Sequence, residues 1–240
     1  RLLPLLGVCY FLSYLDRTNI SVAALTMNAD IGLSDAAFGL GAGLFFIGYF
    51  FFEVPSNMVM HRVGARIWMA RIMVSWGVVA GLQAFVVGET SFYAVRVLLG
   101  IAEAGFFPGM ILYLTYWFPA EYRARAVGWF MAAVPLSTAV GAPLGGLLLR
   151  LDGVAGLAGW QWLFLVEAVP TVILGFLLLW WLPDRPEHVD WLSADQKGWL
   201  EGRLDAEARE SEGQHVSEWQ SLRHPRVLGL SLGYFAIVFG

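Results

Sequence analysis

Residues 2–25 read LLPLLGVCYFLSYLDRTNISVAAL, an apolar run interrupted about two thirds of the way along by Asp16 and Arg17. About twenty apolar residues suffice for a helix to cross a bilayer, so the run predicts a membrane-spanning helix. A charge that deep in a membrane is costly, and it is kept mainly where it faces a protein interior or a water-filled cavity. The pair therefore predicts a functional site within the membrane.

The composition of the chain is that of a membrane protein. Of its 240 residues, 58% are hydrophobic and 14% are charged, whereas soluble domains average about 25% charged residues. The one cysteine, Cys9, cannot form an internal disulfide. The four histidines are scattered through polar connections, so we expect neither a metal site nor a cofactor.

Further apolar runs of spanning length cover residues 36–60, 67–88, 91–115, 126–149 and 160–182. They predict an all-α polytopic membrane protein with a six-helix bundle over 1–182. Residues 183–225 form a connection in this prediction, and 226–240 start a seventh span. The motif Leu-Leu-Gly, which occurs in the first and fourth spans before a mid-span acid, suggests two three-helix repeats. Because the sequence begins at Arg1 rather than Met and stops within an apolar run, we expect about half of a longer protein.

Lysine and arginine are distributed unevenly between the two sides of the spans. Arg17 and Arg96 lie within spans, Arg150 lies in a connection on one side, and all the others lie at the N-terminus or on the other side. Cytoplasmic loops carry the excess of Lys and Arg, so we predict a cytoplasmic N-terminus and a cytoplasmic 183–225 connection. Ser193 and Gln196 have the spacing of a capping box, which predicts a helix near 194–210. This connection could be a solvated linker or a regulatory docking segment.

A second span repeats the placement of charges within an apolar run. Arg96 and Glu103 are seven positions apart, about two helical turns, so they share a face of the helix. At about 1.5 Å per residue, Asp16, Tyr49 and Glu103 fall in the middle third of a core about 30 Å thick. Side chains from three helices thus predict one cavity near the midplane, with Arg96 nearer its outer end.

The partners of these charges decide what the cavity can hold. Neighbouring residues project about 100° apart on a helix, so Asp16 and Arg17 need different partners, for which Glu103 and Arg96 are candidates. Arginine suits a carboxylate because its planar fork makes two parallel hydrogen bonds. The sequence therefore favours a ligand site at Arg17 over a purely structural ion pair, while Arg96 could also simply neutralise Glu103.

Three acids lie in apolar surroundings. At Glu103, apolar surroundings favour the protonated carboxyl group, whereas a nearby arginine favours the carboxylate. Glu103 can therefore change protonation when an anionic substrate competes for the arginine. This predicts a proton carrier, with membership of a structural ion pair as the alternative. We expect Glu53 and Glu167 to serve in gating or packing, Glu167 by satisfying backbone groups that Pro170 frees.

Several motifs occur in an order that resembles a known family. They read YLDRTN at 14–19, FEVPSN at 52–57, HRVGAR at 61–66, RVLLGIAEAGFFPG at 96–109, WQWLF at 160–164 and PDRP at 183–186. The chain resembles the major facilitator superfamily, and more narrowly its anion:cation symporters, the tartrate, phthalate, hexonate and hydroxyphenylacetate permeases. The resemblance covers essentially the whole chain.

The resemblance implies twelve helices in two bundles with the substrate between them, this chain being the N-terminal six-helix bundle, the central loop and the start of helix seven. Arg17 matches the substrate-binding arginine of helix one, and Asp16 matches its neighbouring acid. Glu103 matches the proton-coupling glutamate of helix four, and Arg96 matches the arginine of that helix. The aromatic positions that contact substrate are matched by Tyr14 and Tyr49.

One motif departs from the family pattern. The superfamily's loop between helices two and three usually reads Gly-x-x-x-Asp-Arg-x-Gly-Arg, and here Asn57 stands for the first Gly and His61 for the Asp. Arg62 and Arg66 follow, and we assign both to gating or packing. The change at His61 puts the usual charge-relay account of the cytoplasmic gate in doubt.

Together these observations predict a proton-coupled importer of a small organic anion in a bacterial inner membrane, working by alternating access. We expect the anion, protons and the bilayer as partners, no nucleic acid, and a monomer completed by a C-terminal half. The alternatives are a proton-independent exchanger or facilitator and a membrane anion sensor. An enzyme is the weakest alternative, because the spans carry no His or Cys cluster, no nucleophile with a base and no Gly-rich phosphate loop.

Overall fold

The computed structural model describes residues 2–212, 225, 227–229 and 232–233. The chain divides into two compact units, Arg1–Ser193 and Ala194–Gly240. The described residues of both units form helices, turns and loops, with no strand among them. The prediction of an all-α fold is therefore confirmed.

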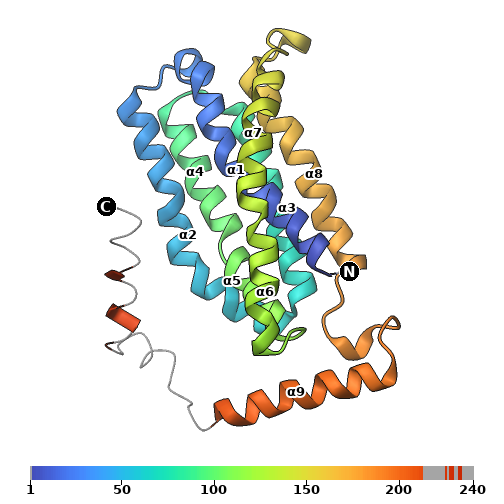
Figure 1. Ribbon diagram of the computed structural model, residues 1–240. Helices are drawn as coiled ribbons and strands as arrows, with labels where there is room; N and C mark the ends of the chain where they lie inside the picture. The colour runs from blue at the N-terminus through green and yellow to red at the C-terminus, as the bar shows by residue number, and fades with distance from the viewer. Residues whose placement is uncertain (1, 213–224, 226, 230–231, 234–240) are drawn as a thin grey trace. The chain divides into compact units, whose positions relative to one another are not determined.

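The first unit is a helical bundle (Figure 1). Its α-helices are α1 (Leu2–Ile31), α2 (Asp35–Val63), α3 (Ala65–Leu82), α4 (Glu89–Glu103), α5 (Phe106–Thr115), α6 (Ala120–Met131), α7 (Ala133–Leu149) and α8 (Gly159–Trp181). Short 3-10 helices follow α3, α7 and α8 at Gln83–Phe85, Val154–Gly156 and Pro186–His188.

Most of the predicted spans have the length and apolarity that a membrane requires. Among the described residues, the helical stretches that meet both conditions are 35–63, 65–85, 89–115, 120–149 and 159–181. α1 is more polar because Asp16, Arg17 and Asn19 lie close together in it. It nevertheless has 30 residues, about 45 Å at 1.5 Å per residue, which exceeds the thickness of a bilayer core.

One of the predicted spans is broken in the middle, and another is interrupted at a single residue near its start. The sequence predicted single helices over 91–115 and 126–149, whereas the structure splits the first into α4 and α5 and the second into α6 and α7. The first split falls at Gly105, which has a φ of 84°, and the second at Ala132, where φ and ψ stay helical at −62° and −17°, so that only the first is a true break. Each position lies three residues before a proline. A proline has no N–H to donate and is tolerated in the first turn of a helix, so it starts a new helix more readily than it continues one.

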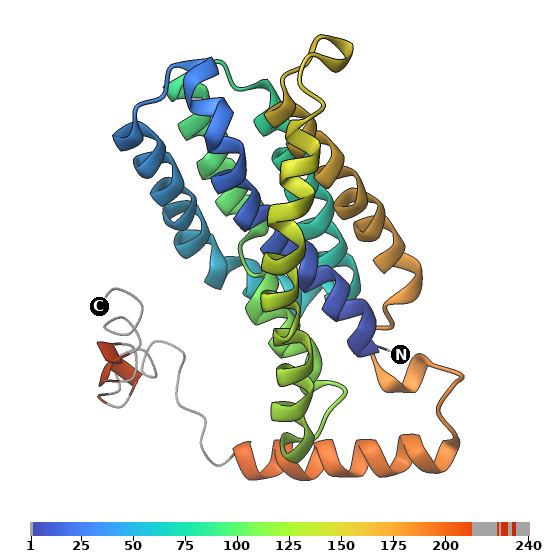
Figure 2. The same ribbon diagram turned by 45° about the horizontal axis from the view of Figure 1, so that its top comes forward.

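Three helix pairs form the bundle. α3 lies along α8, α2 along α4, and α1 along α7 (Figure 2). α1 belongs to span one and α7 to span five, while α2 is span two and α4 belongs to span four. If spans one to three and spans four to six are two repeats, a contact between spans one and five requires an equivalent contact between spans four and two. The α1–α7 and α2–α4 pairs are these two contacts. Glycines allow the close approach, because a Cβ at Gly77 of α3 would lie 2.7 Å from Val172 of α8. A Cβ at Gly141 of α7 would lie 2.8 Å from the hydroxyl oxygen of Thr18 of α1.

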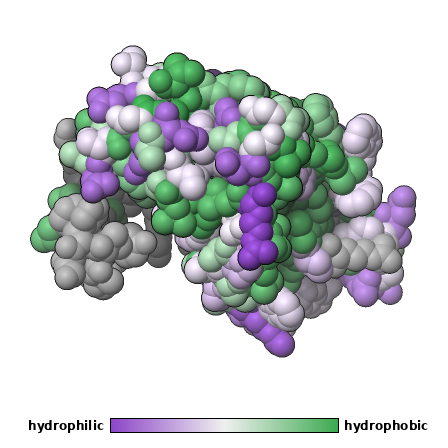
Figure 3. Space-filling view, turned by 90° about the horizontal axis from the view of Figure 1, so that it is seen from above, coloured by the Kyte–Doolittle hydropathy of each residue, from purple (hydrophilic) through white to green (hydrophobic). Residues whose placement is uncertain are grey.

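The outside of the bundle carries large apolar side chains. Phe50 and Phe51 of α2 and Trp180 of α8 are 67–72% exposed. Figure 3 looks onto the end of the bundle that carries the loops at 32–34 and 150–158, where hydrophilic side chains gather among hydrophobic ones. Exposed apolar flanks with polar residues at an end are the pattern expected of a bundle surrounded by lipid.

The second unit contains α9 (Ala194–Glu212), where the sequence predicted a helix near 194–210. Trp199 of α9 is 54% exposed, whereas Leu200 is buried. The predicted start of a seventh span at 226–240 lies largely outside the described residues.

Candidate functional site

The two mid-membrane charges of opposite sign on α1 and α4 meet. Arg17 of α1 donates from Nε and Nη2 to the same oxygen, Oε1 of Glu103, at 3.1 and 2.8 Å. Ser13, one helical turn before Arg17, donates its hydroxyl to that oxygen as well, at 2.8 Å. The sequence named Glu103 as a candidate partner of Arg17, and the structure brings the two together.

The ion pair is asymmetric in its exposure and in its hydrogen bonding. The side chain of Arg17 is 29% exposed, whereas that of Glu103 is 1% exposed. The second carboxyl oxygen of Glu103, Oε2, is buried and has no hydrogen-bond partner. The Nη1 nitrogen of Arg17 takes no part in the two bonds to Glu103. The guanidinium of Arg17 thus keeps N–H groups that do not bond Glu103, on a side chain that is partly exposed.

Aromatic rings surround the guanidinium. Its carbon lies 5.3 Å from the ring centre of Tyr14, 5.4 Å from that of Tyr49 and 5.6 Å from that of Phe45. Contacts of this length between a guanidinium and a ring are attractive. The structure thus places both tyrosines that the sequence named beside Arg17, and it adds Phe45 of α2.

Asp16 points to a different neighbour, as the angle between adjacent helical residues requires. Its Oδ2 accepts a hydrogen bond of 3.2 Å from the indole N–H of Trp76 on α3. Its charge also interacts with that of Glu103 and, more weakly, with those of Arg96 and Arg17. Asp16 therefore borders the same group of charges but is not the direct partner of Arg17.

Arg96 is buried in α4, about two helical turns before Glu103. Its Nε donates to the backbone oxygen of Gly41 at 3.4 Å, and its guanidinium carbon lies 4.9 Å from the ring centre of Phe45. Of the two arginines that the sequence offered as partners of Glu103, Arg17 forms the ion pair. Arg96 reaches Glu103 only through a longer electrostatic interaction, and Phe45 stands between the two arginines as a shared ring.

The break in the fourth span lies directly after the ion pair. Glu103 is the last residue of α4, and Ala104 and Gly105 separate it from α5. At Gly105 a side chain would have to adopt a left-handed backbone conformation and would lie 2.6 Å from the Cβ of Ser56. Discontinuous helices are a recurring feature of transporter binding sites, because they bring ends of helices to the middle of the membrane.

Glu53 and Glu167 make no hydrogen bond or ion pair with Arg17 among those the structure gives, although the charge of Glu53 acts on Arg17 over a longer distance. Glu53 is half-buried on α2, and its backbone oxygen accepts from the side chain of Asn57 at 2.8 Å. Glu167 is buried on α8, and neither of its carboxyl oxygens has a hydrogen bond. The expectation that the Glu167 side chain satisfies backbone groups freed by Pro170 is therefore wrong. Its charge interacts with that of Asp16, because α1 and α8 pack together.

The predicted gating arginines lie at the opposite end of the bundle from the loops in Figure 3. Arg62 is exposed at the end of α2. Arg66, in the first turn of α3, faces Asp184: the carboxylate accepts from the Arg66 backbone N–H at 2.9 Å and lies 3.4 Å from its Nε. Asp184 thus caps α3, because a carboxylate at a helix N-terminus satisfies an unpaired N–H.

Reasoning from the sequence missed the neutral side chains of the site. Ser13, Phe45 and Trp76 carry no charge and lie in apolar runs, and nothing in the pattern sets Phe45 and Trp76 apart from packing residues. One signal was available for Ser13, since it lies four residues before Arg17 and therefore on the same face of α1. Among the described residues, no group of His, Cys, Asp and Glu could hold a metal ion.

Comparison with known proteins identifies the family. The family model of the Major Facilitator Superfamily matches residues 6–240. The chain belongs to this superfamily. A protein of Agrobacterium vitis named "Putative tartrate transporter" is 55% identical over 100% of this chain and 55% of its own length. A "Quinolone resistance transporter" of Acinetobacter baumannii is 45% identical over 99% of this chain and 55% of its own length.

A solved structure agrees with the assignment of the fold. A bacterial homologue of the human lysosomal transporter Spinster, in an inward-facing and occupied conformation, superimposes with a TM-score of 0.72 at 24% identity. The match covers 77% of this chain and 44% of that one. This chain spans about half the length of the curated relatives, which corresponds to the N-terminal bundle of the superfamily fold. The superfamily consists of transporters and not of enzymes.

Proposed function

We propose that this chain forms the N-terminal bundle of a secondary transporter that moves a small organic anion together with protons by alternating access. The curated relative with 55% identity is named for tartrate, a dicarboxylate, which supports an organic anion as the substrate class. The observation that carries the proposal is the ion pair of Arg17 and Glu103, in which the side chain of the cation is partly exposed and that of the anion is buried.

In this proposal Arg17 holds the substrate carboxylate. Two of its five N–H groups point at Glu103, and we assign the edge that includes Nη1 to a second carboxylate. A planar guanidinium can hold two carboxylates on two edges, which an ammonium cannot do with the same geometry. Tyr14 and Tyr49 would orient hydroxyl or ring groups of the substrate, and Arg96 would contact its far end, while Phe45 separates the two cations.

Proton coupling follows from the competition for Arg17. When a substrate carboxylate shares the guanidinium, Glu103 loses part of its counter-charge while it stays buried, and a fully unpaired buried carboxylate costs several kcal/mol. A proton that binds Glu103, whose Oε2 has no partner, removes that cost. Asp16, held by Trp76 on the other side of α1, is the second proposed proton site.

The remaining parts of the proposal concern orientation and gating. The lysines and arginines concentrated at one side of the spans support a cytoplasmic N-terminus, and bacterial relatives support a bacterial inner membrane. Arg62 and Arg66 would belong to the inner gate, with the bond of Arg66 to Asp184 as a contact that rearranges when the gate moves. Glu53 and Glu167 would act in packing or gating rather than in binding.

Uptake by the purified full-length protein in liposomes tests the proposal. With an inward proton gradient, tartrate is expected to accumulate above its outside concentration, and a protonophore is expected to abolish the accumulation. Equilibration without accumulation would show that protons do not drive the transport.

A second function is favoured by one observation. Because the open edge of Arg17 can bind an anion without displacing Glu103, exchange or facilitated diffusion of the anion needs no proton. Exchange of labelled for unlabelled tartrate that proceeds equally at all pH gradients, together with the absence of gradient-driven accumulation, would favour this alternative.

A further inference from the structure

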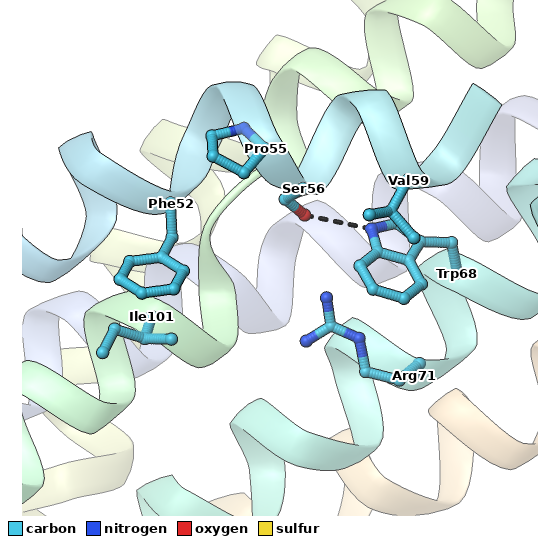
Figure 4. Close-up of a pocket in the computed structure, with 7 residues that line it drawn as sticks. All are labelled: Phe52, Pro55, Ser56, Val59, Trp68, Arg71 and Ile101. Atoms are coloured by element: carbon cyan, nitrogen blue, oxygen red, sulfur yellow. Dashed lines mark hydrogen bonds between the residues drawn. The ribbon is translucent and has the colours of Figure 1, made fainter. Parts of the chain in front are cut away.

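A groove separate from the ion pair opens between α2, α3 and the inner end of α4 (Figure 4). Its volume is about 380 Å³. Its walls are formed by Phe52, Pro55, Ser56, Val59, Trp68, Arg71 and Ile101. Phe52 is 46% exposed, so this wall of the groove is open to the surroundings of the bundle. The groove therefore combines apolar walls with a single cation.

The cation, Arg71 of α3, has no acidic partner within the part of the chain that the structure describes. The ion pairs found among the described residues involve other arginines. Its Nη1 makes one long bond, 3.4 Å, to the hydroxyl of Ser75, and its guanidinium carbon lies 3.9 Å from the ring centre of Trp68. Its Nε is buried without a hydrogen-bond partner. Figure 4 shows the guanidinium reaching into the space between Phe52 and Trp68.

The depth of Arg71 corresponds to the boundary between lipid headgroups and lipid tails. α2 has 29 residues, about 43 Å, so with α2 centred on a hydrocarbon core about 30 Å thick each of its ends extends some 6 Å beyond the core. Arg71 lies six residues after the start of α3 at Ala65, about 9 Å along the helix axis. It therefore lies within a few ångströms of that boundary, where tryptophans such as Trp68 are also common.

We propose that this groove binds an anionic phospholipid, with the phosphate on Arg71 and an acyl chain along Phe52, Pro55 and Ile101. The unpaired guanidinium supplies the charge-assisted hydrogen bonds that a phosphate accepts. Clefts between membrane helices that combine basic groups with apolar walls suit lipids of this kind. A free inorganic anion would match the charge of Arg71 but would leave the apolar walls unfilled, so the amphiphile matches both parts of the groove.

Native mass spectrometry of the purified full-length protein tests the proposal. Phosphatidylglycerol and the zwitterionic phosphatidylethanolamine are added at equal concentrations, and bound lipid is measured for the wild type, Arg71→Gln and Val59→Phe. The matched control is Arg125→Gln, which removes an exposed positive charge of α6 outside the groove. Thermal unfolding without added lipid shows which variants are folded.

The wild type is expected to retain phosphatidylglycerol in preference to phosphatidylethanolamine. Arg71→Gln should lower this retention about tenfold or more, the effect of losing a charge-assisted hydrogen bond. Val59→Phe, which keeps the charge and fills the groove, should lower it too, whereas Arg125→Gln should not. The proposal is overturned if the wild type binds both lipids equally or neither of them, if Arg71→Gln retains as much as the wild type, or if excess inorganic phosphate displaces the lipid.

Discussion

The substitution Arg17→Lys tests how one guanidinium can serve two carboxylates. In the structure Nε and Nη2 of Arg17 hold Glu103 at 3.1 and 2.8 Å, and Nη1 remains for the substrate. A lysine offers one nitrogen, which cannot reach both carboxylates with the same geometry. One charge-assisted hydrogen bond contributes about 1.5–3 kcal/mol, so its loss should weaken anion binding about 10- to 150-fold.

Calorimetric titration of tartrate into the full-length protein in detergent measures this loss. The matched control is Arg125→Lys, which makes the same chemical change at an exposed position of α6 and should leave the dissociation constant unchanged. Thermal unfolding of both variants separates lost binding from lost folding. A dissociation constant for Arg17→Lys within twofold of the wild type would refute the role of the guanidinium.

Three further substitutions test other parts of the structure. Tyr49→Phe keeps the ring beside the guanidinium and removes the hydroxyl. In competition assays, affinity for hydroxylated acids should fall several-fold, while affinity for acids without hydroxyls should change little. Equal losses of affinity for both kinds of acid would contradict an orienting role. Gly77→Val places a side chain against α8 at 2.7 Å and should lower stability by about 1–3 kcal/mol in thermal unfolding, whereas Gly146→Val, with nothing within 4 Å, should not. Asp184→Ala removes the cap of α3 and should lower the free energy of unfolding by about 0.5–2 kcal/mol. If this loss of stability disappears in high salt, the effect comes from the exposed ion pair of Asp184 with Arg66 instead.

The charged part of the site could be predicted because charges within apolar runs are rare. Arg17 and Glu103 each stand out from a run of spanning length, and counting residues along the helices brings them to the same depth. The sequence named Glu103 as a candidate partner of Arg17, and the structure contains this ion pair. Counting residues along α2 places Tyr49 at the same depth in the membrane, and its ring centre lies 5.4 Å from the guanidinium carbon of Arg17.

Two kinds of feature could not be predicted from the chain alone. Trp76 and Phe45 become part of the site only because α3 and α2 pack beside α1 and α4, and an apolar residue gives no sign of which helix it will face. The break after Glu103 had a local signal in Gly105 and the proline that follows it. The same glycine spacing also indicates close helix packing, so the sequence did not separate a break from a contact.

The direct test of proton coupling is tartrate uptake by Glu103→Gln in liposomes. The matched control is Glu89→Gln, an exposed acid in the first turn of the same helix. We predict that Glu103→Gln still exchanges labelled for unlabelled tartrate but no longer accumulates it on a pH gradient, while Glu89→Gln does both. Accumulation by Glu103→Gln at the wild-type level would contradict the account.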